Sequence, residues 1–411
     1  MRTTALVLTS LVTLAANICA QPRQSLDLGG EWEFVKVRDL AEGPPAEGWA
    51  KKTIPGVLSG VAYERAWFRR DFAIPATMQG RRLTIHFGGV KWNSIVRVNG
   101  RQVGGHYGGY EPFTVDITDV ARVGEANRLE LGCHDWTGVF IDHETDFSVL
   151  KQRPADPRDL PRDKILSPVG GRVSDYGPWD RITLQSHPAV YVRDLFIKPS
   201  VRQKKLTVEY VLANETAAAA TVSLTAATEG CAGLGPPRQI AVPAGGEAKA
   251  TVEAAWTDPH LWSPEDPFRY DLVTALYQDG RRVDELHTHF GFREFWVEGP
   301  RFYLNGSRIN LLATSWWPEI GVTADYVRQR LQAIKRANCV AFRTHTQPWP
   351  EVWYEVADEV GLLMIPEGPV WNDRETYRIN DPEFWENYAT ALKAMVDRDK
   401  NKPSVIMYSL E

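Results

Sequence analysis

The sequence has little cysteine and no long basic run, and each absence excludes a broad class of protein. Of its 411 residues four are cysteine, and Cys19 lies in an apolar leader. The remaining Cys133, Cys231 and Cys339 are widely separated. An odd, scattered set does not form a disulfide framework, so we expect free thiols. The net charge is −5, without the Lys and Arg clusters that bind a nucleic-acid backbone, so no nucleic acid is expected as a partner.

Long apolar runs are also lacking outside the first twenty residues, "MRTTALVLTSLVTLAANICA". These have a charged start at Arg2, an apolar stretch from Ala5 to Ala16 and a small-residue cleavage site at Cys19-Ala20. The apolar stretch is too short to span a bilayer. Residues 1–20 therefore predict a signal peptide, export to the periplasm or the cell exterior, and no membrane partner after cleavage.

The sequence motifs of several enzyme classes are missing as well. There is no G-x-x-x-x-G-K-[ST], no H-E-x-x-H, no G-x-S-x-G and no paired C-x-x-C, so other common chemistries find no support. We predict no cofactor. Aromatic residues, by contrast, are plentiful, with 15 Trp, 14 Tyr and 15 Phe. An indole suits the apolar face of a sugar ring, although a tryptophan-rich core also explains the number.

Two all-β regions come first. Residues 21–188 contain short alternating runs such as "RRLTIHFGGV" and "SIVRVNG", and Asn99-Gly100 predicts a hairpin. A Pro- and charge-rich interval at 149–170 predicts a long surface loop. Residues 189–293 contain about seven strands in roughly 100 residues, the size of an immunoglobulin-like sandwich, with a second hairpin at Asp279-Gly280. Both regions are predicted to be β-sandwiches.

From residue 294 onward, strands alternate with helices. The runs "RINLLAT", "CVAFR", "LLMIP" and "SVIMYS" predict four strands. Apolar residues at helical spacing predict three intervening helices, with Thr323 and Asp381 as N-caps and Gly361 as a C-cap. Repeated βα units predict a parallel sheet of a (β/α)8 TIM barrel. Such a barrel needs about 250 residues, so residues 294–411 would supply only its first half.

Four runs are distinctive: Phe87 to Thr118, "LWSPEDPFRYDL", "GFREFWVEGPRFYLNGSRINLLA" and "DRDKNKPSVIMYSLE". Together with the domain order they resemble the family 2 glycoside hydrolases, which include β-galactosidases, β-glucuronidases and β-mannosidases. The run from Phe87 to Thr118 is similar to the family's sugar-binding domain, and "LWSPEDPFRYDL" to the end of its middle domain. The run "GFREFWVEGPRFYLNGSRINLLA" is similar to the beginning of its barrel. The resemblance implies a jelly-roll sugar-binding domain at 21–188, an immunoglobulin-like β-sandwich at 189–293 and a truncated TIM barrel at 294–411.

The fourth motif, "DRDKNKPSVIMYSLE", bears on catalysis because it is similar to the family's R-N-H-P-S-[IV]-I-x-W-S-x-G-N-E. Ser409 and Leu410 match its Ser-x positions, and Glu411 occupies the Gly position. The resemblance therefore implies that the general acid/base comes two residues beyond Glu411 and that the nucleophile comes later still. We expect no catalytic carboxylate in this chain, which would then be an N-terminal fragment and inactive alone.

The resemblance also implies five substrate-binding residues. Arg343 and His345 in "AFRTHTQPWP" resemble the family's R-T-S-H-x-P, except that the His comes one position early. In the family the Arg helps to hold the catalytic carboxylates and the His donates to a sugar hydroxyl; solvated loop residues are the alternative. Glu367 in "IPEGP" resembles the family's D-E-A, without the His of its metal-binding version, so no metal is expected. Trp316 and Trp317 in "ATSWWPE" follow the first barrel strand, where they fit sugar stacking or packing of the barrel rim.

The resemblance, together with the predicted signal peptide, thus implies an exported glycoside hydrolase that acts on terminal β-linked sugars with retention, with a carbohydrate as its partner. Two alternatives stay open, a non-catalytic carbohydrate-binding protein and an inactive member of the family. The sequence specifies neither the sugar nor the linkage. It does not specify the oligomeric state either, and a homo-oligomer is compatible with it.

Overall fold

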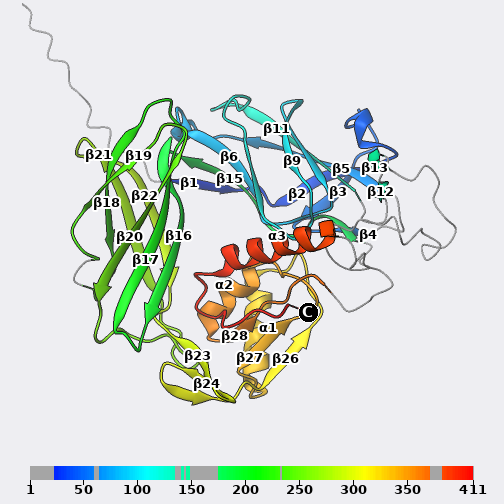
Figure 1. The fold of residues 1–411 in the computed structure, drawn as a ribbon. Helices are drawn as coiled ribbons and strands as arrows, with labels where there is room; N and C mark the ends of the chain where they lie inside the picture. The colour runs from blue at the N-terminus through cyan, green and yellow to red at the C-terminus, as the bar shows by residue number, and fades with distance from the viewer. Residues whose placement is uncertain are drawn as a thin grey trace, which may run out of the picture.

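The computed structural model describes residues 23–59, 64–134, 140–142, 145–148, 175–231, 234–370 and 382–410. Two β-sandwiches and a mixed helix–sheet unit make up these residues (Figure 1). The predicted signal peptide, the predicted loop at 149–170, Asp381 and Glu411 lie outside the described residues.

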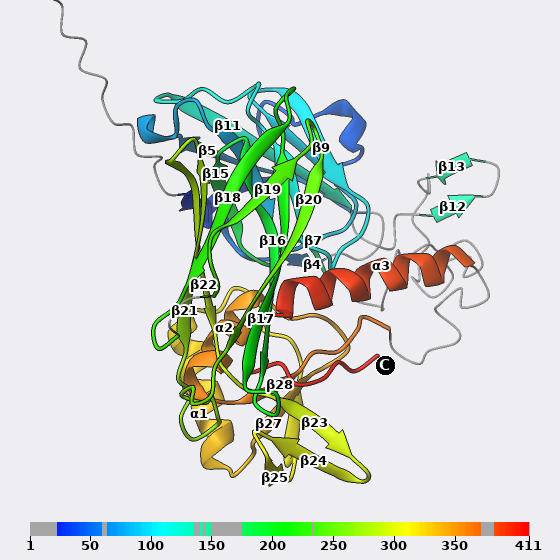
Figure 2. The same cartoon turned by 60° about the vertical axis from the view of Figure 1, so that its left-hand side comes forward.

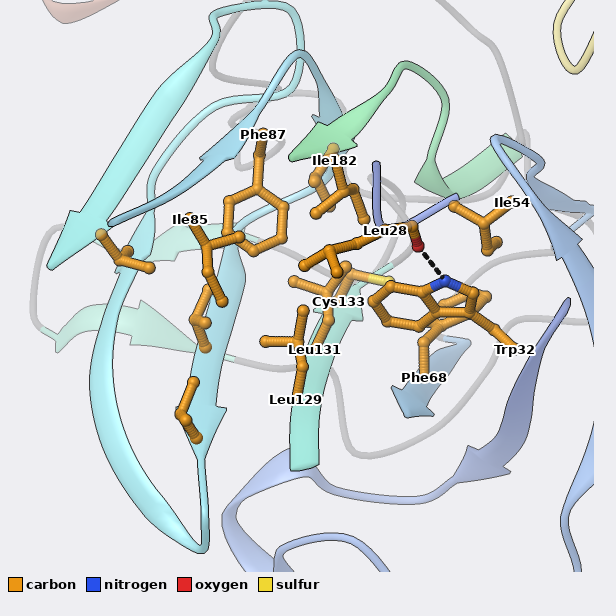
Figure 3. Packing of buried hydrophobic residues seen from close by; sticks show 14 of the residues in the cluster. Leu28, Trp32, Ile54, Phe68, Ile85, Phe87, Leu129, Leu131, Cys133 and Ile182 are labelled. Carbon is orange, nitrogen blue, oxygen red and sulfur yellow. Dashed lines mark hydrogen bonds between the residues drawn. The ribbon is translucent and has the colours of Figure 1, made fainter. Parts of the chain in front are cut away.

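The first sandwich consists of two large antiparallel sheets. Their strands are β1 (Gln24–Asp27), β2 (Gly30–Val37), β3 (Ala50–Ile54), β5 (Arg65–Ala73), β6 (Arg82–Phe87), β8 (Ser94–Val98), β9 (Arg101–His106), β10 (Phe113–Asp116), β11 (Ala126–His134) and β15 (Ile182–His187). One sheet has the order β1-β15-β6-β10 and the other β3-β2-β5-β11-β8-β9. Alternate residues of β6 and β8 are buried, as expected for strands with one face on a core. In that core Trp32 is fully enclosed and its Nε1–H donates to the carbonyl of Leu28 at 2.7 Å (Figure 3).

Smaller elements flank these sheets. They are the strands β4 (Leu58–Ser59), β7 (Val90–Lys91) and β14 (Asp175–Pro178), the pair β12 (Phe140–Asp142) and β13 (Thr145–Ser148), and the short 3-10 helices Leu40–Glu42 and Ala76–Met78. The strands β4, β14 and β7 form a separate three-stranded sheet. The hairpin predicted at Asn99-Gly100 is confirmed, because both residues have positive φ and connect the paired strands β8 and β9.

The second sandwich has the strands of an immunoglobulin-like domain. They are β16 (Val190–Ser200), β17 (Lys205–Asn214), β18 (Ala220–Ala227), β19 (Arg238–Val242), β20 (Glu247–Ala255), β21 (Tyr270–Gln278) and β22 (Arg281–Phe290). One sheet has the order β16-β17-β20 and the other β19-β18-β21-β22. The hairpin predicted at Asp279-Gly280 connects β21 to β22 with positive φ at both residues, so that prediction is confirmed too.

The helix–sheet unit follows an antiparallel sheet of β23 (Phe295–Glu298), β24 (Arg301–Leu304) and β25 (Ser307–Ile309). Its own elements are the parallel strands β26 (Ala313–Trp316), β27 (Ala341–Thr344) and β28 (Leu363–Ile365) and the helices α1 (Ala324–Arg336), α2 (Glu351–Val360) and α3 (Pro382–Asp399). In Figures 1 and 2, α3 runs between the first sandwich and this sheet. Two of the three predicted caps are confirmed, since Thr323 Oγ1 accepts from Tyr326 N at 3.2 Å and Gly361 adopts the left-handed conformation with φ 70°.

Two of the predicted barrel strands differ in the structure. The run "RINLLAT" is divided between β25 and β26. The run "SVIMYS" is not a continuous strand, since it pairs only through isolated bridges, Met364 with Val405 and Glu367 with Ser409. Between these bridges lies Pro366, which accepts from Ser409 N at 2.8 Å but has no N–H to donate, and this interrupts the ladder.

A buried carboxyl connects α2 to the segment after α3. Oδ1 of Asp358 accepts from Ser404 N at 2.9 Å, and burial raises the pKa of Asp358 to about 6. Its ordinary pKa is 3.8, so between these values the folded chain holds a proton that the unfolded chain has lost. The contribution of this proton to the stability of the folded chain is therefore complete below about pH 4 and is lost as the pH rises through about 6.

We predict that Asp358→Asn keeps the acceptor for Ser404 but removes this pH dependence. The variant should be more stable than the wild type by about 3 kcal/mol at pH 7.5, and the two should converge near pH 4, since one pKa unit corresponds to about 1.4 kcal/mol. Urea denaturation at a series of pH values measures this. Substitution of an exposed carboxylate, Glu47→Gln, is the control. Parallel wild-type and Asp358→Asn curves would contradict the prediction.

Candidate functional site

Arg343 and Glu367 form an ion pair at the carboxyl ends of β27 and β28. Arg343 is in register with Ser315 and Ile365, so these three side chains share one face of the sheet. Glu367 follows Ile365 by two residues and therefore lies on the same side. Arg343 Nε lies 3.0 Å from Oε2 of Glu367, whose side chain is 3% exposed, whereas that of Arg343 is 39% exposed. The arrangement is a buried carboxylate held by a guanidinium that still reaches solvent.

The loop that follows β27 holds the carboxylate from a second side. The backbone N–H of Thr346 donates to Oε1 of Glu367 at 3.3 Å, and the N–H of Glu367 donates to Oγ1 of Thr344 at 2.8 Å. Thr346 has φ 56°, a left-handed conformation that β-branched residues rarely adopt. Backbone strain of this kind persists only where the surroundings hold it. The prediction from sequence did not single out Thr344 or Thr346, and their only signal is membership of the same motif as Arg343.

The chain segment around Ser409 lies beside Glu367. The N–H of Gly368 donates to the carbonyl of Ser409 at 2.8 Å, next to the Glu367–Ser409 bridge. Tyr388 on α3 donates its hydroxyl to the carbonyl of Leu410. The residues matched to the family's strand-4 motif therefore lie at the same end of the sheet as the ion pair.

Trp317 and His345 add an aromatic pair to this end of the sheet. Their ring centroids are 4.3 Å apart and the rings are nearly perpendicular, with an interplanar angle of 88°. Trp317 is 64% exposed, so most of its indole is accessible to a ligand. An exposed indole next to a hydrogen-bonding imidazole and an ion pair has the chemistry of a sugar site, with a stacking surface and polar groups that bind hydroxyls.

Trp316 is not brought together with the other four predicted residues. It lines a groove of about 310 Å³ beside α1, together with Thr314, Phe342 and Arg330. The guanidinium of Arg330 lies 5.1 Å from the centroid of the Trp316 ring. Since successive strand residues face opposite sides, Trp316 faces the helix layer whereas Ser315 shares the side of Arg343.

In the described part of the chain, no group of three or more His, Cys, Asp or Glu residues is arranged to hold a metal ion. None of the helices there combines the length and apolar composition that a membrane crossing requires.

Sequence models of three parts of one enzyme family match this chain in consecutive order. The sugar binding domain of glycosyl hydrolases family 2 matches residues 57–151, a second model described as glycosyl hydrolases family 2 matches 190–293, and the TIM barrel domain of the family matches 293–411. The chain belongs to glycosyl hydrolase family 2. The resemblance and the fold class predicted from the sequence are thereby confirmed.

Curated relatives of this family 2 chain carry the names of two activities. A β-glucuronidase from Paenibacillus borealis is 25% identical, over 94% of this chain and 67% of that protein. A β-galactosidase from Bacteroides ovatus is 24% identical, over 96% of this chain and 47% of that protein. A putative β-glucuronidase from Formosa agariphila is 26% identical, over 84% of this chain and 31% of that protein. The chain thus spans from 31% to 67% of the length of these relatives.

Solved structures show the same fold at low sequence identity. Bacteroides uniformis β-glucuronidase 2 matches with a TM-score of 0.74 at 21% identity, over 94% of this chain and 46% of that one. A β-galacturonidase from Eisenbergiella tayi matches with a TM-score of 0.75 at 20% identity, over 96% of this chain and 66% of that one. At this identity the likeness concerns the fold, and the roles of the five site residues stay a prediction.

Proposed function

We propose that this chain forms the sugar-binding region and part of the substrate site of a retaining β-glycosidase that acts on terminal β-linked sugars, such as β-glucuronides or β-galactosides. The observation that carries the proposal is the Arg343–Glu367 ion pair beside Ser409. It lies at the carboxyl ends of parallel strands, where enzymes with TIM barrels bind their substrates. The names of the curated relatives support the choice of sugars.

Retaining hydrolysis requires two carboxyl groups about 5 to 5.5 Å apart. One donates a proton to the leaving oxygen and later activates water, while the other attacks the anomeric carbon. By the register of the family motif, the acid/base would come two residues after Glu411, and the nucleophile later in the barrel. We therefore assign Glu367 to contact with the sugar rather than to either of these roles.

The remaining residues of the site supply binding and orientation. In the ion pair, Nε of Arg343 lies 3.0 Å from Oε2 of Glu367, and we assign the Nη donors of the guanidinium to the catalytic carboxylates and the substrate. His345 would donate to a sugar hydroxyl and Trp317 would stack on the sugar ring. The predicted signal peptide at 1–20 is the basis for proposing export, which a fusion of these residues to a periplasmic reporter enzyme would test.

The test compares the 411-residue chain with a longer protein translated from the same reading frame, if the frame continues. We expect the longer protein to release nitrophenol from an aryl β-glucuronide, β-galactoside or β-mannoside, with the β-anomer of the sugar as the first product by NMR. The shorter chain should show no turnover. Turnover by the shorter chain would contradict the placement of the carboxylates. Inactivity of the longer protein on all three substrates would favour a binding protein or an inactive family member.

A further inference from the structure

A lysine and a tyrosine of the first sandwich meet one glutamine of the barrel. The side chain of Lys91, in β7, is 0% exposed, and its Nζ donates to Oε1 of Gln347 at 3.3 Å. The hydroxyl of Tyr110 donates to the same oxygen at 3.3 Å. Gln347 is itself buried and lies in the loop after β27, next to Thr346. In Figure 2, β7 lies at the end of the first sandwich that is nearest to α3.

The sandwich holds both donors firmly. Nζ of Lys91 also lies 3.1 and 3.2 Å from the two carboxylate oxygens of Asp175, which offset part of the desolvation of the buried ammonium. The Tyr110 ring contacts Trp92 edge to face, at 5.0 Å between centroids. Gly109 permits this packing, because a Cβ at that position would lie 2.1 Å from the Trp92 ring. A buried lysine is rare and requires partners, and here one partner belongs to the active-site loop of another domain.

The contacted glutamine adjoins the strained part of the site. Thr346, with φ 56°, precedes Gln347 and directs its N–H to Oε1 of Glu367. An isolated loop would relax from this conformation, so it needs a restraint on either side. The Thr344–Glu367 bond is the restraint on one side, and the bonds of Gln347 to the sandwich are in position to act on the other.

We propose that Lys91 and Tyr110 are positioning residues of the glycosidase site. By holding Gln347 they fix the loop at 344–347, keep the amide of Thr346 on Glu367 and thereby set the Arg343–Glu367 pair. The first sandwich then has a role beyond sugar binding and domain packing, because it controls the geometry of the substrate site. The inference rests on the proposed function only in assigning this loop to catalysis.

The first test measures hydrogen exchange in the 411-residue chain carrying Tyr110→Phe, which removes only the hydroxyl. We expect exchange in the peptide covering 344–347 to become about three- to tenfold faster, the effect of losing one hydrogen bond, with an unchanged Tm. Tyr210→Phe is the matched control, since Tyr210 is equally buried and its hydroxyl lies 3.1 Å from Oγ1 of Thr274 in the second sandwich. It should leave the peptide unchanged.

Two variants of the glutamine make the test specific. Gln347→Glu keeps an acceptor for both donors and should stay near the wild-type exchange rate, whereas Gln347→Leu should exchange at least as fast as Tyr110→Phe. Unchanged exchange in both Tyr110→Phe and Gln347→Leu would overturn the proposal. This result does not depend on enzymatic activity, so it separates failure of this inference from failure of the proposed function.

The second test measures kinetics in the longer protein, where the reading frame continues and that protein hydrolyses one of the aryl β-glycosides. Tyr110→Phe should lower kcat/KM about three- to tenfold, as expected for one hydrogen bond, while Tyr210→Phe leaves it unchanged. An equal loss of kcat/KM in Tyr110→Phe and Tyr210→Phe would indicate general destabilisation of the protein and overturn the positioning role. Rescue of kcat/KM in Gln347→Glu, but not in Gln347→Leu, would support it.

Discussion

Replacement of Arg398 by leucine is expected to lower the free energy of unfolding of the barrel region by about 3 to 5 kcal/mol, the usual effect of removing one partner of a buried ion pair. Nε and Nη2 of Arg398 donate to the two carboxylate oxygens of Asp399, each at 2.8 Å, and Nη1 donates to the carbonyl of Trp349 at 3.0 Å. Asp399 is completely buried and lies at the end of α3. In the variant its carboxylate would lose both of these hydrogen bonds without gaining contact with water.

Hydrogen exchange in increasing urea is the appropriate measurement, because a chain of several domains can unfold in more than one step. The free energies of unfolding to compare are those of the transition in which α2 and α3 lose their protection from hydrogen exchange. Arg336→Leu changes the same residue type at an exposed position on α1 and should alter stability by about 0.5 kcal/mol or less. Arg398→Leu combined with Asp399→Asn should recover part of the loss, since the charge at position 399 is removed together with its partner. A loss below about 1 kcal/mol for Arg398→Leu alone would contradict the expectation.

The parts of the fold that sequence predicts well depend on a few consecutive residues. The hairpins at Asn99-Gly100 and Asp279-Gly280 and the helix end at Gly361 each require positive φ, which Gly and Asn or Asp adopt at low cost. The prediction of a fourth barrel strand was wrong because strand pairing depends on the partner strand as well as on the apolar run. The interruption comes from Pro366, about forty residues earlier in the chain.

The candidate site was predictable to the extent that strand order determines it. Arg343 and Glu367 meet because the carboxyl ends of adjacent parallel strands lie together. Trp316 was assigned from a strand expected to end at Thr314; the actual strand continues to Trp316, and its alternation turns this residue toward α1. The contact between Lys91 and Gln347 joins residues 256 positions apart, and no local pattern in the sequence indicates it.

Trp262→Ala is expected to destabilise the junction between the second sandwich and the barrel by about 3 to 5 kcal/mol, the usual loss for a buried tryptophan. Trp262 is fully buried and packs with Leu304, Ala341 and Leu363. Its Nε1–H donates to the carbonyl of Asp358 in α2 at 3.0 Å. A single indole thus fills the space between the two domains and also bonds to the helix beyond it.

Two controls separate packing from hydrogen bonding at this position. Trp262→Phe keeps most of the packing but loses the Nε1–H bond, so it should lose only about 1 to 2 kcal/mol. Trp316→Ala removes the same side chain from a position that is 53% exposed and should lose about 1 kcal/mol or less. Hydrogen exchange in urea, followed in α2 and β28, measures all three variants. Since the indole contacts α2 directly, protection there should fall before that of β16 and β17. If Trp262→Ala and Trp316→Ala are equally stable, the junction is held by contacts other than this indole.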